Sequence, residues 1–283
     1  MATITTAMIT DLRARTNAGM MDCKRALVET GGNMEEAIKV LRLKGLAIQV
    51  KRADKEAKEG IVASASSGCG NVVSLVEVNS ETDFVAKTDN FKNFVAAVAE
   101  KALEGVDPAE AMKDELVAIV SATGENVKIR RSALFQKEGT GKIESYIHMG
   151  GKVGVLVEVG CGKEETAASE AFAALVHDVA LQVAAAAPRW LDRGQVDPAV
   201  LESEMNLYRQ QLAGQDKPAA IMDNILKGKA NKFYSDVCLV DQLFVKNEPG
   251  EKTTVGQLVK KAAKDLDDTI AIRRFVRFQL GAS

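Results

Sequence analysis

The chain has 283 residues, a formal charge of −2 at pH 7 and 46% hydrophobic residues, an ordinary composition for a globular protein. The near-neutral charge argues against a nucleic-acid-binding protein that works by neutralising phosphates. Its four cysteines lie far apart, so no close pair indicates a zinc or redox centre. No apolar run is long enough to span a membrane, and no signal peptide is visible. We therefore expect a cytoplasmic protein, long enough for two domains, without metal or cofactor.

Residues 1–55 are predicted to form a small module of three helices. The first helix places Ile4, Met8 and Leu12 on one face and is broken by the turn residues Thr16–Gly19. A second helix follows from Met20, and a third begins with the capping-box-like sequence at Asn33. Because such a module buries little apolar surface, we expect it to pack against a partner or the main body.

Residues 56–140 are predicted to form the first half of a sheet-and-helix core. Gly60–Ser66 and Asn71–Val78 have the pattern of a hairpin. A helix is predicted over about Asn90–Leu103, and helical spacing continues around Leu116. The strand Val127–Phe135 completes this half.

Residues 141–283 repeat the same order of elements. A hairpin, Lys142–His148 and Lys152–Val159, is followed by a long helix predicted over Glu164–Ala186, and a helix at Thr254–Leu266 precedes a closing strand. Two short strings recur in the same order: Leu-Val-Glu-Val at 75–78 and 156–159, and Ile-Arg-Arg at 129–131 and 272–274. This recurrence predicts a duplicated antiparallel sheet-plus-helix unit.

The second repeat carries an insertion at about 190–232. Leu201, Met205, Tyr208 and Leu212 step by four, three and four residues, which is the spacing of a coiled-coil seam. After a turn at Gly214–Pro218, helical spacing returns, so a projecting helical hairpin is predicted, with two further core helices as the alternative. Strands are predicted to resume over Phe233–Val245.

The stretch Ser80–Lys87 joins a buried strand to a helix, at a corner where loops often carry function. By position alone, Thr82 or Asp83 would cap the following helix and Phe84 would fill the core beneath it. No catalytic constellation competes with this stretch, because His148 and His177 have no carboxylate or cysteine at a metal-binding spacing. The sequence thus favours a binding protein over an enzyme.

Four stretches, in order along the chain, resemble the signatures of the bacterial elongation factor Ts family. These are Leu12–Leu27 (with Asn17 where the family usually has glycine), Thr82–Lys87, Gly124–Arg131, and Ser145–His148 followed by Gly154–Val157. The likeness extends over essentially the whole chain, including the helical hairpin.

The resemblance implies a guanine-nucleotide exchange factor of protein biosynthesis that binds elongation factor Tu carrying GDP. It would promote release of Mg²⁺ and GDP so that GTP can reload. Thr82–Val85 would displace the magnesium ion, with Asp83 and Phe84 wedged between two helices of the partner's GTPase domain, so that Phe84 is exposed rather than buried. The further contacts implied are Arg13, Met20, Met21, Lys24, Gly124, Asn126 and His148.

The expected fold class is α+β: a three-helix N-terminal module similar to ubiquitin-associated (UBA) modules, the duplicated core and the coiled-coil hairpin. A second hypothesis is a protein-binding or dimerisation scaffold without exchange activity, and a small-molecule enzyme is a distant third. A homodimer and a 2:2 complex with the partner both stay open, as does the role of Asp83 as helix cap or partner contact. Some family members have a further C-terminal helix that touches the partner, and we expect its contacts to be absent here.

Overall fold

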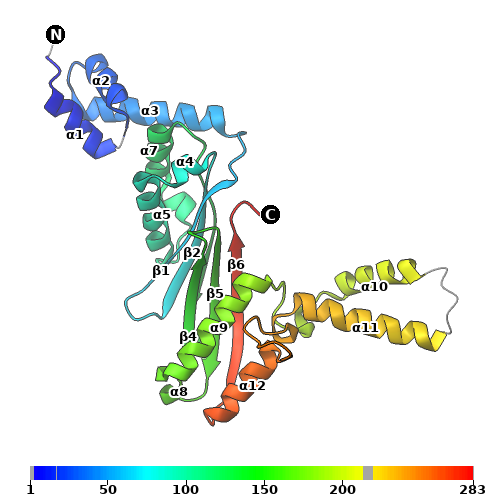
Figure 1. Cartoon of the computed structure of the whole chain (residues 1–283). Coiled ribbons are helices and arrows are strands. Elements are labelled where there is room, and N and C mark those ends of the chain that lie inside the picture. The colour runs from blue at the N-terminus through cyan, green and yellow to red at the C-terminus, as the bar shows by residue number, and fades with distance from the viewer. Residues whose placement is uncertain (1–2, 17, 213–218, 283) are drawn as a thin grey trace. The chain divides into compact units, whose positions relative to one another are not determined.

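The computed structural model describes residues 3–16, 18–212 and 219–282 (Figure 1). Over these residues it contains twelve α-helices and two three-stranded sheets, which confirms the α+β class. The chain divides into two compact units, Met1–Gln136 with Ile147–Gly154 and Phe278–Ser283, and Lys137–Tyr146 with Val155–Arg277. The finer division predicted from the sequence, at residues 55 and 140, stays a prediction. No helix in the described part of the chain has the length and apolar character needed to cross a membrane.

The N-terminal module consists of α1 (Thr6–Thr16), α2 (Met20–Glu29) and α3 (Met34–Arg52). The Asn33 side chain caps α3 by accepting a hydrogen bond from the Glu36 N–H at 3.2 Å. The three helices share a core of small and aliphatic side chains: Leu12, Ala18, Cys23, Ala26, Leu27, Ala37 and Leu41. Asn17, within the predicted helix break, lies outside the described residues.

Helix α3 also packs closely on α7 (Lys113–Thr123). The contact is made at Gly45, where an added Cβ would lie 2.7 Å from the Val117 carbonyl oxygen and 3.1 Å from the Ser121 Cβ. Glycine is unfavourable inside a helix, by about 1 kcal/mol relative to alanine. It is needed here because the two helix backbones approach too closely for a side chain.

We therefore expect Gly45→Ala to destabilise the protein by about 1–3 kcal/mol despite alanine's better helix propensity, because the new methyl group overpacks the contact with α7. Chemical denaturation followed by circular dichroism measures this change. Gly228→Ala is the matched control, since Gly228 lies inside α11 (Ala219–Val237) with nothing within 4 Å of its added Cβ. The control should stabilise its helix by about 0.5–1 kcal/mol; equal effects at both sites would contradict the close-packing argument.

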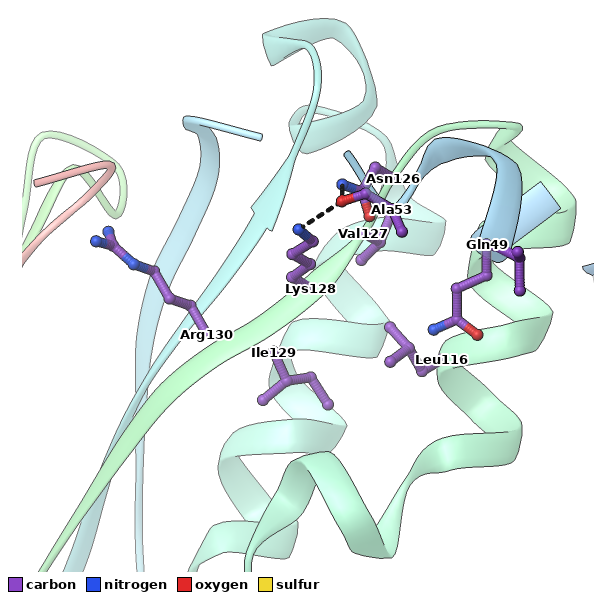
Figure 2. A pocket seen from close by; sticks show the side chains of 9 residues that line it. Gln49, Ala53, Leu116, Asn126, Val127, Lys128, Ile129 and Arg130 are labelled. Carbon is purple, nitrogen blue, oxygen red and sulfur yellow. Dashed lines mark hydrogen bonds between the residues drawn. The ribbon is translucent and has the colours of Figure 1, made fainter. Parts of the chain in front are cut away.

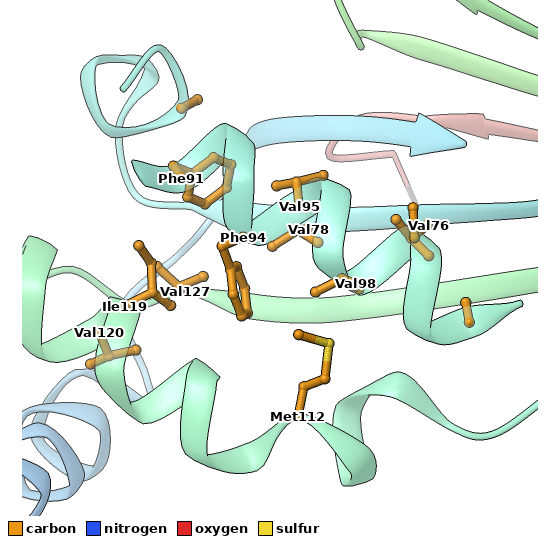
Figure 3. Packing of buried hydrophobic residues seen from close by; sticks show 13 residues of the cluster. Val76, Val78, Phe91, Phe94, Val95, Val98, Met112, Ile119, Val120 and Val127 are labelled. Atoms are coloured by element: carbon orange, nitrogen blue, oxygen red, sulfur yellow. The ribbon is translucent and has the colours of Figure 1, made fainter. Parts of the chain in front are cut away.

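The first sheet has the order β1–β2–β3 and is antiparallel, with β1 at Glu59–Ser66, β2 at Val72–Ser80 and β3 at Lys128–Gln136. Helix α5 (Asp89–Ala102) packs on this sheet, and α6 (Pro108–Ala111) contacts β3. Helix α7 packs against α5. The core that these elements share includes Val76, Val78, Phe91, Phe94, Val95, Val98, Met112, Ile119, Val120 and Val127 (Figure 3). The predicted hairpin, helices and closing strand of this half are all present, within a few residues.

A charged side chain lies buried at the middle of β2. The Glu77 carboxylate is fully buried and accepts hydrogen bonds from Arg130 at 2.9 Å and Arg131 at 2.6 Å, both on β3. It also accepts from the Asn79 side chain at 3.1 Å and the Gly281 N–H at 2.9 Å. Burial by itself raises the pKa of Glu77, but these donors outweigh burial and hold the pKa below its ordinary value.

The second sheet has the order β4–β5–β6, with β4 at Gly141–His148, β5 at Val153–Cys161 and β6 at Ile270–Gln279. The helix predicted over Glu164–Ala186 is two helices, α8 (Glu164–Ala168) and α9 (Glu170–Ala186). The chain breaks between them because Ser169 has an extended backbone and caps α9, accepting from the Phe172 N–H at 3.2 Å. Helix α12 (Val255–Asp265) follows the prediction closely.

The insertion forms two long helices, α10 (Pro198–Leu212) and α11, which lie side by side and project from the rest of the second unit (Figure 1). The predicted turn at Gly214–Pro218 falls outside the described residues. The strands predicted over Phe233–Val245 are wrong: α11 continues to Val237, and a 3₁₀ turn follows at Leu239–Asp241. The start of this segment is helical rather than extended because Phe233 and Val237, one helical turn apart, pack with Val196 and Trp190 in a small core at the base of the hairpin.

Candidate functional site

The conspicuous surface feature of the first unit is a short helical tip between β2 and α5. Helix α4 (Asp83–Ala86) has only four residues, and Thr82 caps it by accepting from the Val85 N–H at 3.4 Å. Thr88 caps the longer helix that follows, accepting from the Phe91 N–H at 3.3 Å. The cap expected at Thr82 or Asp83 is thus Thr82, and it serves an intervening helix that the sequence pattern did not predict.

The tip presents an aromatic side chain to solvent. Phe84 is 77% exposed, whereas Ala86 is buried and Val85 packs against the core below. The position-based expectation that Phe84 fills the core is therefore wrong, because a helix this short turns its second residue outward while its third and fourth face the sheet. Leaving a phenylalanine in water forgoes about 1.5–3 kcal/mol of burial free energy.

Asp83 and Lys87 flank Phe84 as an ion pair one helical turn apart. The Lys87 Nζ lies 2.6 Å from an Asp83 carboxylate oxygen and 5.9 Å from the centre of the Phe84 ring. The hydrogen bond from Lys87 lowers the pKa of Asp83, so this carboxylate stays ionised at neutral pH. The tip therefore offers an apolar ring bordered by one fixed negative and one fixed positive charge.

Two glutamates hold the tip to the loop after α7. The Glu125 carboxylate accepts from the Thr82 N–H at 3.1 Å and from the Thr82 hydroxyl at 2.7 Å. In the reverse direction, the Glu81 carboxylate accepts from the Asn126 N–H at 2.6 Å. Arg52, at the end of α3, donates to both Glu81 oxygens at 2.8 and 2.7 Å. Burial would raise the pKa of Glu81, but the Asn126 N–H and Arg52 lower it below the ordinary value.

Gly124 and Asn126, both predicted as partner contacts, lie in this loop. Gly124 ends α7 in the left-handed conformation, with φ of 71°, which glycine adopts without strain. The Asn126 side chain is only 2% exposed and donates to the Lys55 carbonyl oxygen at 2.7 Å. The Asn126 amide is therefore engaged within the chain, while the backbone of Gly124 lies nearer the surface.

The predicted contacts of the N-terminal module are all exposed. Met20 and Met21 are more than half exposed, and Lys24 one turn later is also exposed. Arg13 is exposed on α1. Cys23, which lies between Met21 and Lys24 in the sequence, faces the module core. This turn of α2 therefore has both exposed and buried residues.

His148 is exposed at the end of β4. Its carbonyl oxygen accepts from the Gly151 and Lys152 N–H groups at 3.2 and 3.1 Å, which closes a tight turn. The next residue, Met149, is 71% exposed and has a φ of 50°, an uncommon conformation for a residue with a side chain. Sequence reasoning missed Met149, although an apolar residue beside two glycines in a turn was a usable signal.

All the predicted contact residues belong to the first compact unit. The structure thus brings into one unit side chains from five separate stretches of the sequence, whose members are Arg13, Met20, Met21, Lys24, Thr82, Asp83, Phe84, Val85, Gly124, Asn126 and His148. Sequence reasoning also missed the residues that hold the tip, Arg52, Glu81 and Glu125. Glu125 lies inside a matched signature and Glu81 directly precedes one. A charged residue at these positions was the signal by which the sequence could have identified them.

A hollow of about 550 Å³ lies beside the Gly124–Asn126 loop (Figure 2). Apolar side chains form its floor, among them Leu116, Val127 and Ile129. Its ionisable lining groups are two cations that are already engaged, Lys128 with the Ala53 carbonyl oxygen at 2.9 Å and Arg130 with Glu77. The lining therefore offers no acid–base pair, and among the described residues no cluster of three or more His, Cys, Asp or Glu could hold a metal ion.

Comparison with known proteins gives a consistent result. A family model described as "Elongation factor TS" matches residues 81–282. Elongation factor Ts of Trichlorobacter lovleyi is 44% identical, over 98% of this chain and 93% of that protein. The proteins of the same name from Nitratidesulfovibrio vulgaris and Clostridium perfringens are 38% and 40% identical, each over 98% of this chain and over 96% and 93% of their own lengths.

Proposed function

Because this chain belongs to the elongation factor Ts family, we propose that its Thr82–Val85 tip is the segment that opens the nucleotide site of its partner. The function of the protein is guanine-nucleotide exchange in translation elongation: it acts on elongation factor Tu carrying GDP and promotes GDP release so that GTP can bind. The scaffold without exchange activity is not favoured. The single observation that carries the assignment of the tip is the exposed Phe84.

The proposed mechanism needs no chemical step in this chain. A nucleotide held by a phosphate loop and magnesium dissociates slowly, because fixed donors and the metal meet the charge of each phosphate oxygen. An exchange factor must bind the nucleotide-free or metal-free partner more tightly than the loaded one, and this difference sets the shift. Phe84 supplies apolar burial between two partner helices only when they separate, while Asp83 adds a negative charge close to the magnesium site.

The remaining contacts provide affinity away from the nucleotide. Met20 and Met21, with Arg13 and Lys24 at their edge, bind the GTPase domain; exposed methionines are adaptable apolar contacts. His148 meets the other end of the partner, and the exposed Met149 beside it enlarges that contact. Gly124 approaches the partner through its backbone, next to the tip. Asn126, buried and bonded internally, contributes by fixing this loop.

The finer architecture of the fold belongs to the same proposal. The three-helix core supports a UBA-like module, and the projecting α10–α11 pair supports a coiled-coil hairpin. Duplication of the core is supported by a repeated buried ion cluster. Glu158 on β5 is fully buried and accepts from Arg273 at 3.2 Å and Arg274 at 2.7 Å, as Glu77 does from its own pair of arginines.

The setting of the activity follows from its role. We place the protein in the cytoplasm, where translation elongation proceeds, with elongation factor Tu as its partner. Sedimentation of the chain alone shows whether it is a homodimer. Sedimentation of its purified complex with elongation factor Tu shows whether that complex is 2:2, because each measurement gives the mass of the assembly.

The function is tested by stopped-flow release of a fluorescent GDP from elongation factor Tu. We expect the chain to accelerate release strongly and to form a stable complex with the nucleotide-free partner. Excess GDP with Mg²⁺ should dissociate this complex, because the loaded form binds the factor less tightly. EDTA should reduce the acceleration, since part of the barrier that the factor lowers is then already removed. A complex that is indifferent to GDP and Mg²⁺, with unchanged GDP release, would instead identify a scaffold.

A further inference from the structure

We propose that Glu125 is a positioning residue for nucleotide exchange, acting with Glu81 to hold the Thr82–Val85 tip so that Phe84 is presented to the partner. The two glutamates form a reciprocal pair: each carboxylate accepts the backbone N–H of the residue that follows the other glutamate, Asn126 and Thr82. We call this pair of contacts the clasp. The inference rests on the proposed function of the tip.

The tip needs such support because its own structure is weak. Helix α4 has four residues, and a single helical turn fixes many backbone angles for few hydrogen bonds. The exposed Phe84 ring adds a driving force against presentation, because turning it inward would bury apolar surface. A free loop of this composition would sample inward conformations, and binding would then have to select the rare presented one.

Glu125 opposes this at the first residue of the tip. Its two oxygens take both donors of Thr82, the N–H and the hydroxyl, so the carboxylate fixes the backbone and the side chain together. Because the hydroxyl proton is directed at Glu125, an oxygen lone pair is left to accept the Val85 N–H and cap α4. Hydrogen bonds to a charged acceptor are stronger than neutral ones. Glu125 therefore sets the direction in which the helix, and Phe84 with it, leaves the sheet.

Glu81 connects the base of the tip to α3. Arg52 binds both Glu81 oxygens, while the Asn126 side chain donates to the carbonyl oxygen of Lys55, just beyond α3. The end of the helix that carries the N-terminal module is thus tied to the base of the tip. Two contacts held by a rigid connection lose less freedom on binding than two that move independently.

The test is a mutant cycle on GDP release from elongation factor Tu, measured at saturating factor. Glu125→Ala should lower the maximal release rate about tenfold, the scale of one charge-assisted hydrogen-bond pair. Glu125→Gln, which keeps one acceptor oxygen and the side-chain volume, should cost only a few-fold. In a Phe84→Ala background, Glu125→Ala should have little further effect, because the residue acts through the ring. Glu100→Ala is the control, since Glu100 is an exposed glutamate on α5.

Thermal melts of each variant separate positioning from unfolding, and Thr82→Val gives a second route, because it removes the hydroxyl donor but keeps the Glu125 side chain. Equal fold-losses for Glu125→Ala with and without Phe84 would overturn the proposal, as would unchanged rates in both Glu125→Ala and Thr82→Val. If Phe84→Ala itself exchanges like the wild type, the proposed function of the tip fails first, and the positioning role falls with it. The Phe84→Ala rate alone therefore tells the two failures apart.

Discussion

Replacing Phe84 with alanine is expected to slow catalysed GDP release from elongation factor Tu by about tenfold to a hundredfold while leaving the melting temperature of the protein unchanged. The kinetic loss corresponds to about 1.5–3 kcal/mol, the free energy of burying one phenylalanine side chain. The stability is spared because the ring is 77% exposed and its removal opens no cavity. Stopped-flow release of fluorescent GDP, with calorimetry of the factor alone, measures both quantities.

Phe91→Ala provides the matched comparison for that experiment. Phe91 is the next phenylalanine along the chain and is fully buried in the core under α5, so its truncation should cost about 3–5 kcal/mol of stability. The two substitutions should thus separate cleanly, one changing kinetics and the other changing the melt. A low melting temperature with a normal exchange rate for Phe84→Ala would show that the ring supports the fold rather than the reaction.

The exposure of Phe84 illustrates what sequence pattern alone could not decide. Periodicity identified β2 and α5 correctly, and a phenylalanine between them is compatible with core or surface. The deciding geometry is the extra four-residue helix capped by Thr82, which is too short to leave a periodic signal. Only the resemblance to a known family favoured the exposed position, and the structure agrees with it.

Other parts of the fold were predictable to different degrees. The hairpins and long amphipathic helices were predicted within a few residues, because their patterns are local. The strands expected over Phe233–Val245 failed because an apolar run fits a strand or a buried helix end equally well. The clasp could not be predicted from the sequence for a different reason. Thr82 and Glu125 are separated by 43 positions, and a contact that depends on tertiary structure leaves no local sequence pattern.

The buried Glu77 leads to a second large expected effect, this time on stability. Glu77→Ala should destabilise the protein by about 3–5 kcal/mol, because the arginines Arg130 and Arg131 lose their common partner and remain partly buried. By contrast, Glu202→Ala removes one partner of an exposed ion pair with Arg209 and should change stability by less than about 1 kcal/mol. Urea denaturation of the two variants gives both values on one scale.

The Glu77 carboxylate also determines how the stability of the protein is expected to depend on pH. Since the pKa of Glu77 in the folded protein lies below its ordinary value of 4.5, the unfolded chain binds the proton more readily than the folded one. The stabilisation by Glu77 is therefore complete above about pH 4.5 and is lost as the pH falls through the lower, folded-state pKa. In Glu77→Gln the difference in stability from the wild type should shrink steadily over that acidic range, whereas it should stay constant at neutral pH. A difference that is the same at pH 3 and pH 7 would mean that the carboxylate charge does not stabilise the sheet, and that the cluster of Glu77 with its arginines serves only to fix the geometry of β2 against β3.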